Sequence, residues 1–226
     1  FFPCCIILNN DLSDGVPEVL QNLKQRFMPM MQLGWSTRLK SGHFRFYEEV
    51  SKEFGEEIGM DPWLVNPYFD QCPEVDFKKK EGQECLVNRA EALLKRVQKK
   101  YDEYNIDREP FLVVKADQGT YGMAVMMIRK PEDLRELNRK QRNRMSMSKG
   151  GVEVTKAFIQ EGVYSFETVN DDSVAEPVLY MIGRNVIGGF YRVHEKKGPD
   201  ENLNAPGMNF QPLAFQSPCN LPCEEP

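Results

Sequence analysis

The feature that most constrains the fold is a change of sequence pattern near residue 110. Before this point, apolar residues recur at three- and four-residue spacing, as they do along one face of a helix. From Pro110 onward, short apolar runs alternate with turn residues. This predicts an α+β fold, with a mainly helical part over 1–109 and a strand-rich part over 110–215. Residues 216–226 have the composition of a linker.

Three helices are expected in the first part. The first is capped by Ser13 and Asp14, the second covers 43–58 and ends at Gly59, and the third covers 84–104. The third helix carries the basic run LKRVQKK, which we interpret as a solvated face. The apolar residues that recur at helical spacing in these segments are Val19, Leu20, Leu23, Phe46, Val50, Phe54, Ile58, Leu86, Leu93, Leu94 and Val97.

The second part contains short apolar runs between turns, which predict strands. One amphipathic helix is expected among them, from Pro131 to about Met145. The expected strands cover 111–115, 124–128, 157–160, 174–182 and 185–193.

Composition argues against several classes of protein. The formal net charge of -5 is not that of a general binder of nucleic acid or of anionic membranes. No apolar run approaches the roughly 20 residues that span a bilayer. Residues 1–8 are apolar but short and lack a basic leader, so we expect neither a signal peptide nor a membrane anchor.

The 6 cysteines form no C-x-x-C pair and no regular framework. Reduced thiols in the cytoplasm are therefore expected. Cys219 and Cys223 resemble half of a metal site, but no second pair or nearby histidine completes it, so zinc is not expected. The chain lacks an initiator methionine and ends in SPCNLPCEEP, and we expect it to be a fragment of a larger protein.

The stretch FLVVKADQGTYGM delivers Lys115 from an apolar run into a turn. Glycine lets backbone N–H groups approach an anion closely, and the lysine adds a full positive charge. The candidate phosphate-binding residues are Lys115, Gly119, Thr120, Tyr121 and Gly122. An ordinary hairpin between two apolar runs would also use such a turn, and this alternative stays open.

Other nucleotide motifs are excluded by residue order. No G-x-x-x-x-G-K-[ST] or G-x-G-x-x-G occurs, and the protein-kinase order of glycine loop before lysine is reversed here. A lysine strand, a loop of small residues and a returning strand resemble the ATP-grasp ligases. By that resemblance, Gln160 and the backbone from Glu161 to Val163 face adenine, and Glu167 reaches the ribose. Alternatively, QEGVYSFE is a strand with alternating exposed polar groups.

Further along, the chain resembles glutathione synthetases, which follow a hairpin with an arginine and then an N-L-x-A-x-G stretch. Arg192 and Asn202 fall at these positions in GGFYRVH and ENLNAPGM. The resemblance implies that Arg192 offers a planar cation to the phosphoryl group that is transferred. Taken alone, Arg192 is also compatible with a surface position on a strand.

Longer motifs narrow the resemblance to one family. The chain resembles the proteobacterial-type glutamate-cysteine ligases, which are related to the ATP-grasp enzymes, and the similarity covers nearly all of its length. Family members are longer at both ends. The motifs that carry the resemblance are NNDLSDGVPEVL, KSGHF, DPWLVNPYF, VVKADQGTYGM, NRKQRNRMS, QEGVYSFET, EPVLYMIGR, GGFYRVH and ENLNAPGM.

The family resemblance implies an ATP-dependent reaction that joins the γ-carboxyl of glutamate to the amine of cysteine. A carboxylate is a poor electrophile, so ATP first converts it to an acyl phosphate. Such chemistry needs positioning and charge neutralisation more than a protein nucleophile. This agrees with the lack of an evident Ser-His-Asp or Cys-His set; His43 and His194 are the only histidines.

The family also implies Mg²⁺, for which Glu176 and Asn202 are the candidate ligands, with Glu201 and Asn204 as further possibilities. The α-carboxylate of glutamate needs a cation, and Arg38, Lys40 or the run at 78–80 could supply it. Each of these groups could equally be a solvated surface charge. Two other functions stay open, namely another carboxylate-amine ligase of the ATP-grasp superfamily and a non-catalytic nucleotide-binding fragment.

Overall fold

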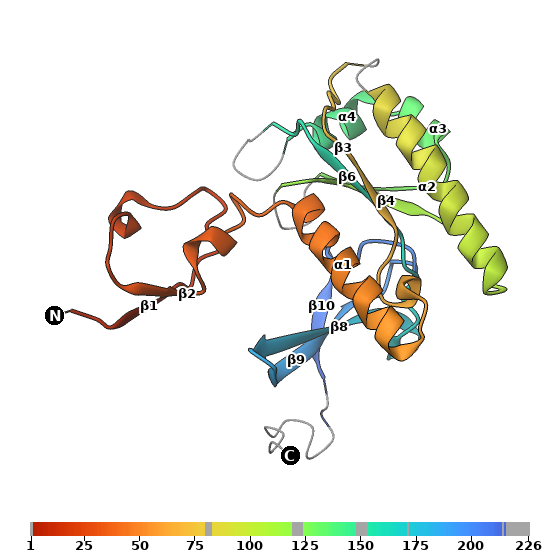
Figure 1. Ribbon diagram of the computed structural model, residues 1–226. Coiled ribbons are helices and arrows are strands. Elements are labelled where there is room, and N and C mark those ends of the chain that lie inside the picture. Colours follow the sequence, from red (N-terminus) through yellow and green to blue (C-terminus); the bar gives the residue numbers. More distant parts are fainter. Residues whose placement is uncertain are drawn as a thin grey trace. The chain divides into compact units, whose positions relative to one another are not determined.

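The computed structural model, shown in Figure 1, describes residues 2–79, 83–118, 124–147, 153–170, 172–213 and 215. The chain divides into two units, residues 1–162 and residues 163–226. Helices and antiparallel sheets occur together, which confirms the predicted α+β class. Within the described ranges, no helix combines the length and the apolar character that a membrane crossing requires.

The first unit contains a four-stranded sheet in the order β3-β6-β4-β5, with antiparallel pairing throughout. Strand β6 pairs with both β3 and β4, so residues before and after position 110 belong to one hydrogen-bonded ladder. The predicted boundary at 109–110 therefore lies inside this unit, and β3 interrupts the part that was expected to be mainly helical. The strands are β3 (Phe69–Cys72), β4 (Leu112–Ala116), β5 (Val125–Ile128) and β6 (Ala157–Glu161).

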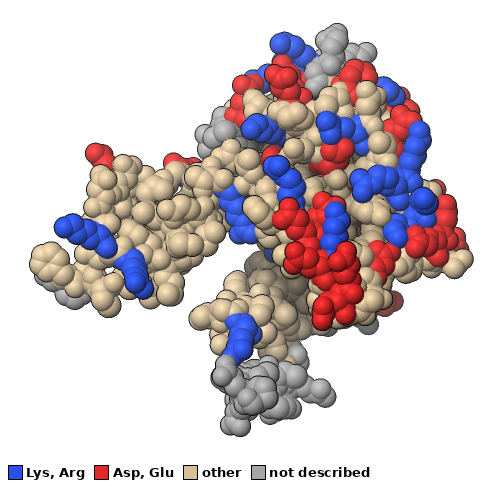
Figure 2. All heavy atoms as spheres, in the orientation of Figure 1, with Lys and Arg blue, Asp and Glu red and all other residues tan. Residues whose placement is uncertain are grey.

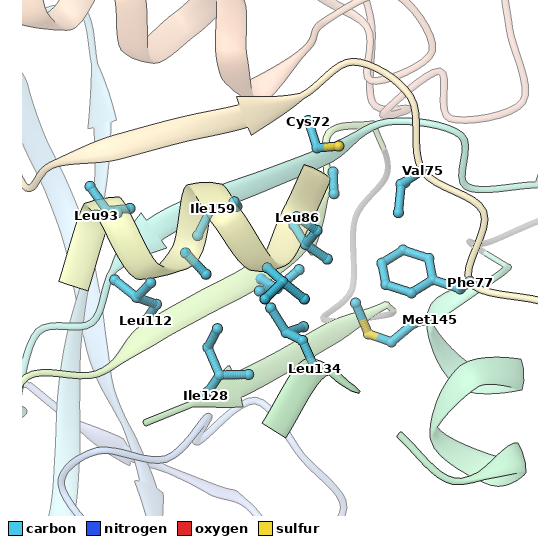
Figure 3. Packing of buried hydrophobic residues seen from close by; sticks show 14 of the residues in the cluster. Cys72, Val75, Phe77, Leu86, Leu93, Leu112, Ile128, Leu134, Met145 and Ile159 are labelled. Carbon is cyan, nitrogen blue, oxygen red and sulfur yellow. The ribbon is translucent and has the colours of Figure 1, made fainter. Parts of the chain in front are cut away.

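Helix α2 (Glu84–Glu103) packs its buried residues against the buried residues of β4 and β6. Burial alternates along β4, as expected for a strand with one face on a core. Figure 3 shows Leu86 and Leu93 of α2 in one cluster with Leu112 and Ile159 of the sheet. Each fully buried leucine contributes about 1.5 to 3 kcal/mol, so this cluster is the main stabilising feature of the unit.

Helix α1 (Lys40–Ile58) packs on the opposite face of the sheet, because its Phe44 stacks on Phe158, with ring centroids 5.2 Å apart. It begins three residues before the expected start at 43. Its buried residues are small: Ser41, Ser51 and Gly55. A Cβ at Gly55 would lie 2.5 Å from the carbonyl oxygen of Met60, so this close approach requires glycine.

The apolar stripe that predicts α1 is exposed. Phe46, Val50, Phe54 and Ile58 retain 72%, 61%, 50% and 52% of their accessible surface. Acidic residues flank this stripe, and Figure 2 shows acidic side chains gathering over the C-terminal half of α1. Periodicity thus located the helix correctly, but the residues packed inward are the small ones rather than the large apolar ones.

Two expected helices differ in the structure. The segment after Ser13 forms only a 3₁₀ turn at Glu18–Leu20, because Asn22 has a φ of 62°, and a left-handed residue interrupts a helix. The helix expected from 131 to 145 is split into α3 (Glu132–Arg135) and α4 (Arg139–Met145). Asn138 has extended backbone and starts α4 with a capping box, which ends any continuous helix.

The remaining elements of the first unit are short. Strands β1 (Cys5–Ile7) and β2 (Arg26–Met28) pair in parallel, and the other 3₁₀ turns cover Met31–Leu33 and Pro62–Leu64.

The second unit is a four-stranded antiparallel sheet in the order β10-β9-β8-β7. Gly183, at φ 58°, turns the chain between β8 and β9. All five strands predicted from residue 110 onward are present, with ends that differ from the structure by at most one residue. The strands of this unit are β7 (Thr168–Val169), β8 (Ser173–Ile182), β9 (Asn185–His194) and β10 (Asn209–Pro212).

Candidate functional site

Lys115 lies in β4 on the face of the sheet opposite the core. Its neighbours Val114 and Ala116 are buried in the core, and side chains alternate along a strand. The Lys115 Nζ donates a hydrogen bond to Gln160 Oε1 at 2.8 Å. Gln160 is in β6, where it opposes Val113 and therefore shares this face. The structure thus brings together two residues that were predicted separately for phosphate and adenine.

The charge of Lys115 is only partly compensated. Burial, and after it the nearby Lys40 ammonium, lowers the pKa of Lys115 to about 8. Its hydrogen-bond acceptor in the described part of the chain is a neutral amide, and no described carboxylate forms an ion pair with it. A buried cation in such surroundings suits a site that receives an anion.

Residues Gly119, Thr120, Tyr121 and Gly122 lie outside the described residues, so their role as phosphate donors stays a prediction. Just before them, the end of β4 borders a pocket of about 240 Å³. The pocket is lined by Leu39, Ala116, Asp117, Gln118, Glu153, Val154, Thr155 and Lys156.

Glu161 directs its side chain into the first unit. Its carboxylate accepts hydrogen bonds from Trp63 Nε1 at 2.9 Å and from the Tyr68 N–H at 2.9 Å, and the residue is 5% exposed. Burial raises the pKa of this carboxyl group. The Glu161 N–H is also bonded, to the Tyr68 carbonyl at 2.8 Å. The side chain therefore has a structural role, and Val163, which is 70% exposed, is the freer part of the predicted adenine segment.

The cations considered for the glutamate α-carboxylate have partners within the chain. Arg38 Nη2 lies 3.0 Å from His43 Nδ1, and Lys78 forms an ion pair with Glu153 at 2.6 Å. The Lys40 Nζ donates to the Ala116 carbonyl at 2.8 Å. Lys80 lies outside the described residues. Among the described cations of this set, Lys40 is the one that contacts the end of β4, the strand that carries Lys115.

In the second unit, Glu167 lies beside β8, where its carbonyl accepts the Ala175 N–H at 3.0 Å. Burial, and after it the nearby Glu167 carboxylate, raises the pKa of Tyr191. The Glu167 Oε2 atom is buried and has no hydrogen-bond partner among the described residues. A buried oxygen without a donor is costly, and a ligand hydroxyl would satisfy it.

Arg192 follows Tyr191 in β9, and adjacent residues of a strand point to opposite faces. Since Glu167 lies near Tyr191, Arg192 is on the other face of this sheet. There Arg192 Nη1 donates to Glu176 Oε2 at 3.1 Å. Its Nε atom is buried without a partner in the described part of the chain. The structure therefore pairs Arg192 with the predicted metal ligand Glu176 and separates both from Glu167.

Asn202 lies in the loop after β9 and turns its Oδ1 toward the Asn204 N–H at 3.0 Å. His194 fixes this loop: its Nδ1 accepts the Lys196 N–H at 3.2 Å, so Nε2 carries the proton and donates to the Pro206 carbonyl at 3.1 Å. His194 lies two residues after Arg192 in β9, so the two side chains point to the same face of the sheet. His194 is 4% exposed and has a structural role.

The predicted metal ligands do not form a cluster of carboxylates. Among the described residues, no group of three or more His, Cys, Asp or Glu side chains could hold a metal ion. Glu176 has one oxygen in the ion pair with Arg192, and a carboxylate has further lone pairs for a cation. Glu201, a further possibility, is bonded to Lys197 and to the Gly198 N–H instead.

Sequence analysis did not identify Asp117 or Ser41, which join the end of β4 to the start of α1. The available signal was an acidic residue directly after a buried strand in VVKAD.

Comparisons with known proteins agree on one family. The glutamate-cysteine ligase family model matches residues 1–226. A crystal structure of a candidate gamma-glutamylcysteine synthetase from Methylobacillus flagellatus KT is similar, with 53% sequence identity and a TM-score of 0.84. The match covers 98% of this chain and 52% of the other, so the present chain spans about half the length of that protein. No curated protein matches the chain.

Proposed function

The chain belongs to the glutamate-cysteine ligase family, and from this premise we propose that the whole protein joins the γ-carboxyl of L-glutamate to the amine of L-cysteine. The reaction uses ATP and passes through an acyl phosphate, and it is the first step of glutathione biosynthesis. We also propose that the protein is longer than these 226 residues, since the similar solved chain is about twice as long. The proposed fold is of the ATP-grasp type.

The observation that carries this proposal is the environment of Lys115. A buried ammonium group meets a neutral amide, Gln160, and a second cation, Lys40. Such an arrangement is unfavourable for the protein alone and favourable once a polyanion arrives. A nucleoside triphosphate is the polyanion that a ligase of this family requires.

Residue roles follow from the family resemblance. Lys115 and the amides of 119–122 would hold the phosphates, while Gln160 and the backbone of 161–163 would face adenine. The Gln160 oxygen keeps the ammonium group in place before ATP binds. These groups position the nucleotide and neutralise charge, which is where catalysis of phosphoryl transfer mainly arises.

In the second unit, the proposed roles belong to side chains with a buried atom that has no hydrogen-bond partner among the described residues. The orphaned Glu167 Oε2 would accept a ribose hydroxyl, and the orphaned Arg192 Nε would donate to the γ-phosphate, with Asn202 nearby in the chain. Glu176 and Asn202 would hold Mg²⁺, which takes oxygen ligands and keeps several waters. When bound, Mg²⁺ would neutralise charge on the phosphates.

Glutamate and cysteine are the proposed small-molecule partners, and no nucleic acid or membrane partner is proposed. We propose a cytoplasmic location, because the cysteines that the structure describes, Cys4, Cys5, Cys72 and Cys85, are free thiols.

The function is tested by measuring phosphate release by the full-length protein with ATP, Mg²⁺, glutamate and cysteine. Lys115→Met is expected to lower kcat/KM by roughly 30- to 1000-fold, which corresponds to losing about 2 to 4 kcal/mol of transition-state stabilisation. The fold should survive, because methionine fills a similar volume in the sheet face.

A matched control is Lys95→Met, since Lys95 is an exposed residue of α2 that pairs with Glu91. Turnover of Lys115→Met at the wild-type rate would refute the assignment of Lys115. Phosphate release that depends on other amino acids instead of glutamate and cysteine would indicate a different carboxylate-amine ligase. Binding of ATP without any release would indicate a non-catalytic nucleotide-binding protein.

A further inference from the structure

Asp117 is a buried carboxylate two residues beyond Lys115, and it is 2% exposed. A carboxylate this deeply buried is stable only when its oxygens are hydrogen-bonded. Its Oδ1 accepts the Ser41 N–H at 2.8 Å, and its Oδ2 accepts the Ser41 Oγ–H at 2.7 Å. One residue of α1 therefore satisfies both oxygens across 76 positions of sequence.

Asp117 also completes the start of α1. The N-cap residue of this helix, Leu39, forms no side-chain cap. The first N–H groups of a helix need acceptors from elsewhere. Asp117 supplies two, because its carboxylate accepts the Ser41 N–H and its carbonyl accepts the Lys40 N–H at 3.0 Å. A negative charge at this end of a helix is further favoured by the helix dipole.

The Lys40 side chain also bonds to the end of β4. Its Nζ donates to the Ala116 carbonyl at 2.8 Å. The Ala116 N–H is bonded to the Ala124 carbonyl at 3.0 Å, and the Asp117 N–H to the Lys156 carbonyl at 3.0 Å. The two residues after Lys115 are therefore fixed by α1, by the start of β5 and by the segment before β6.

We propose that Asp117, Ser41 and Lys40, here named the Asp117 clamp, position Lys115 for the phosphates of ATP. Asp117 bonds Ser41, and Lys40 bonds the Ala116 carbonyl, so the role proposed for all three is to position Lys115. This inference rests on the proposed function, because it assigns Lys115 to the nucleotide. Its physical basis is preorganisation, since a cation on a fixed strand end loses less freedom when the ligand binds.

The Ser41 hydroxyl offers the cleanest test, because α1 also contains a matched control. Ser51 is likewise a serine of α1, is 3% exposed, and donates its Oγ–H to the Tyr47 carbonyl at 2.6 Å. Calorimetric titration of the full-length protein with ATP and Mg²⁺ is expected to show about tenfold weaker binding for Ser41→Ala. Ser51→Ala should stay within about twofold of the wild type, and Ser41→Thr, which keeps the hydroxyl, should restore binding.

A double variant shows whether the clamp acts through Lys115. In the Lys115→Met background, Ser41→Ala is expected to weaken ATP binding by less than about twofold further, because the group that it positions is gone. Thermal unfolding of both single serine variants controls for general loss of stability. Should Ser41→Ala fail to fold, Ser41→Cys replaces it, because its weaker S–H donor predicts a smaller decrease in the same direction.

The proposal is overturned if Ser41→Ala and Ser51→Ala bind ATP equally well, or if the effects of Ser41→Ala and Lys115→Met are additive. Phosphate release by the wild-type protein with glutamate and cysteine is measured alongside. Its failure would reject the proposed ligase function, whereas normal release with equal serine variants would reject only the clamp.

Discussion

At the scale of residues, the buried ammonium of Lys115 opposes stability while it serves the proposed function. Burial, and after it the nearby Lys40, lowers the pKa of Lys115 from 10.5 to about 8. The unfolded chain therefore binds more protons than the folded chain between these two values. Because stability rises with pH wherever the unfolded state binds more protons, Lys115 makes the free energy of unfolding increase from pH 8 to 10.5.

Lys115→Met is accordingly expected to raise the free energy of unfolding at pH 7 by about 1 to 2 kcal/mol, less than the full charge penalty because Gln160 loses its donor. The gain should shrink toward pH 10.5, where the lysine is neutral in the folded state and about half neutral in the unfolded state. Urea denaturation of both proteins at pH 7 and pH 10 checks this. A difference between them that is the same at both pH values would contradict the assigned cause.

Sequence reasoning expected Lys115 and Gln160 to lie in strands, and the structure has them in β4 and β6, while their roles at the nucleotide stay predictions. It did not foresee that the Glu161 carboxylate is held by Trp63 and Tyr68, which are 98 and 93 positions away. It missed the Asp117 and Ser41 pair for the same reason, since 76 positions separate them. Long-range partners of buried carboxylates depend on the fold and leave no local pattern in the chain.

At the scale of elements, β4, β5, β6, β8 and β9 were predicted within a residue because their apolar runs are short and bounded by turns, whereas β3, β7 and β10 were not predicted. The expected helices differ more from the structure. The apolar stripe of α1 identified the helix but not its buried face, which consists of small residues that allow close packing. The break between α3 and α4 was missed, although Asn138 followed by Gln141 is the sequence signature of a capping box.

The capping box that starts α4 is expected to contribute to stability. Asn138 Oδ1 accepts the Gln141 N–H at 2.9 Å, and Gln141 Oε1 accepts the Asn138 N–H at 2.9 Å. Asn138→Ala removes the cap and is expected to lower the free energy of unfolding by about 1 kcal/mol. Lys140→Ala, an exposed change in the same helix, should cost less than about 0.5 kcal/mol. Equal losses in urea denaturation would show that the capping box is not stabilising.

At the scale of the whole molecule, the two units have separate interiors. The described members of the main core cluster run from Cys72 to Ile159 and all belong to the first unit. The second unit buries its own small set, which includes Val193 and the fully buried Leu203. Units with separate cores can open separately, since local stability follows local burial.

Leu203→Ala should therefore loosen the second unit by about 2 to 4 kcal/mol and leave the first unchanged, because the cavity forms only in the second core. Hydrogen exchange followed by mass spectrometry is expected to speed up in β8 and β9 by roughly 30- to 1000-fold, with α2 unaffected. Leu93→Ala, in the core under α2, should give the converse pattern. Faster exchange in both units after either change would mean that the two cores are thermodynamically coupled.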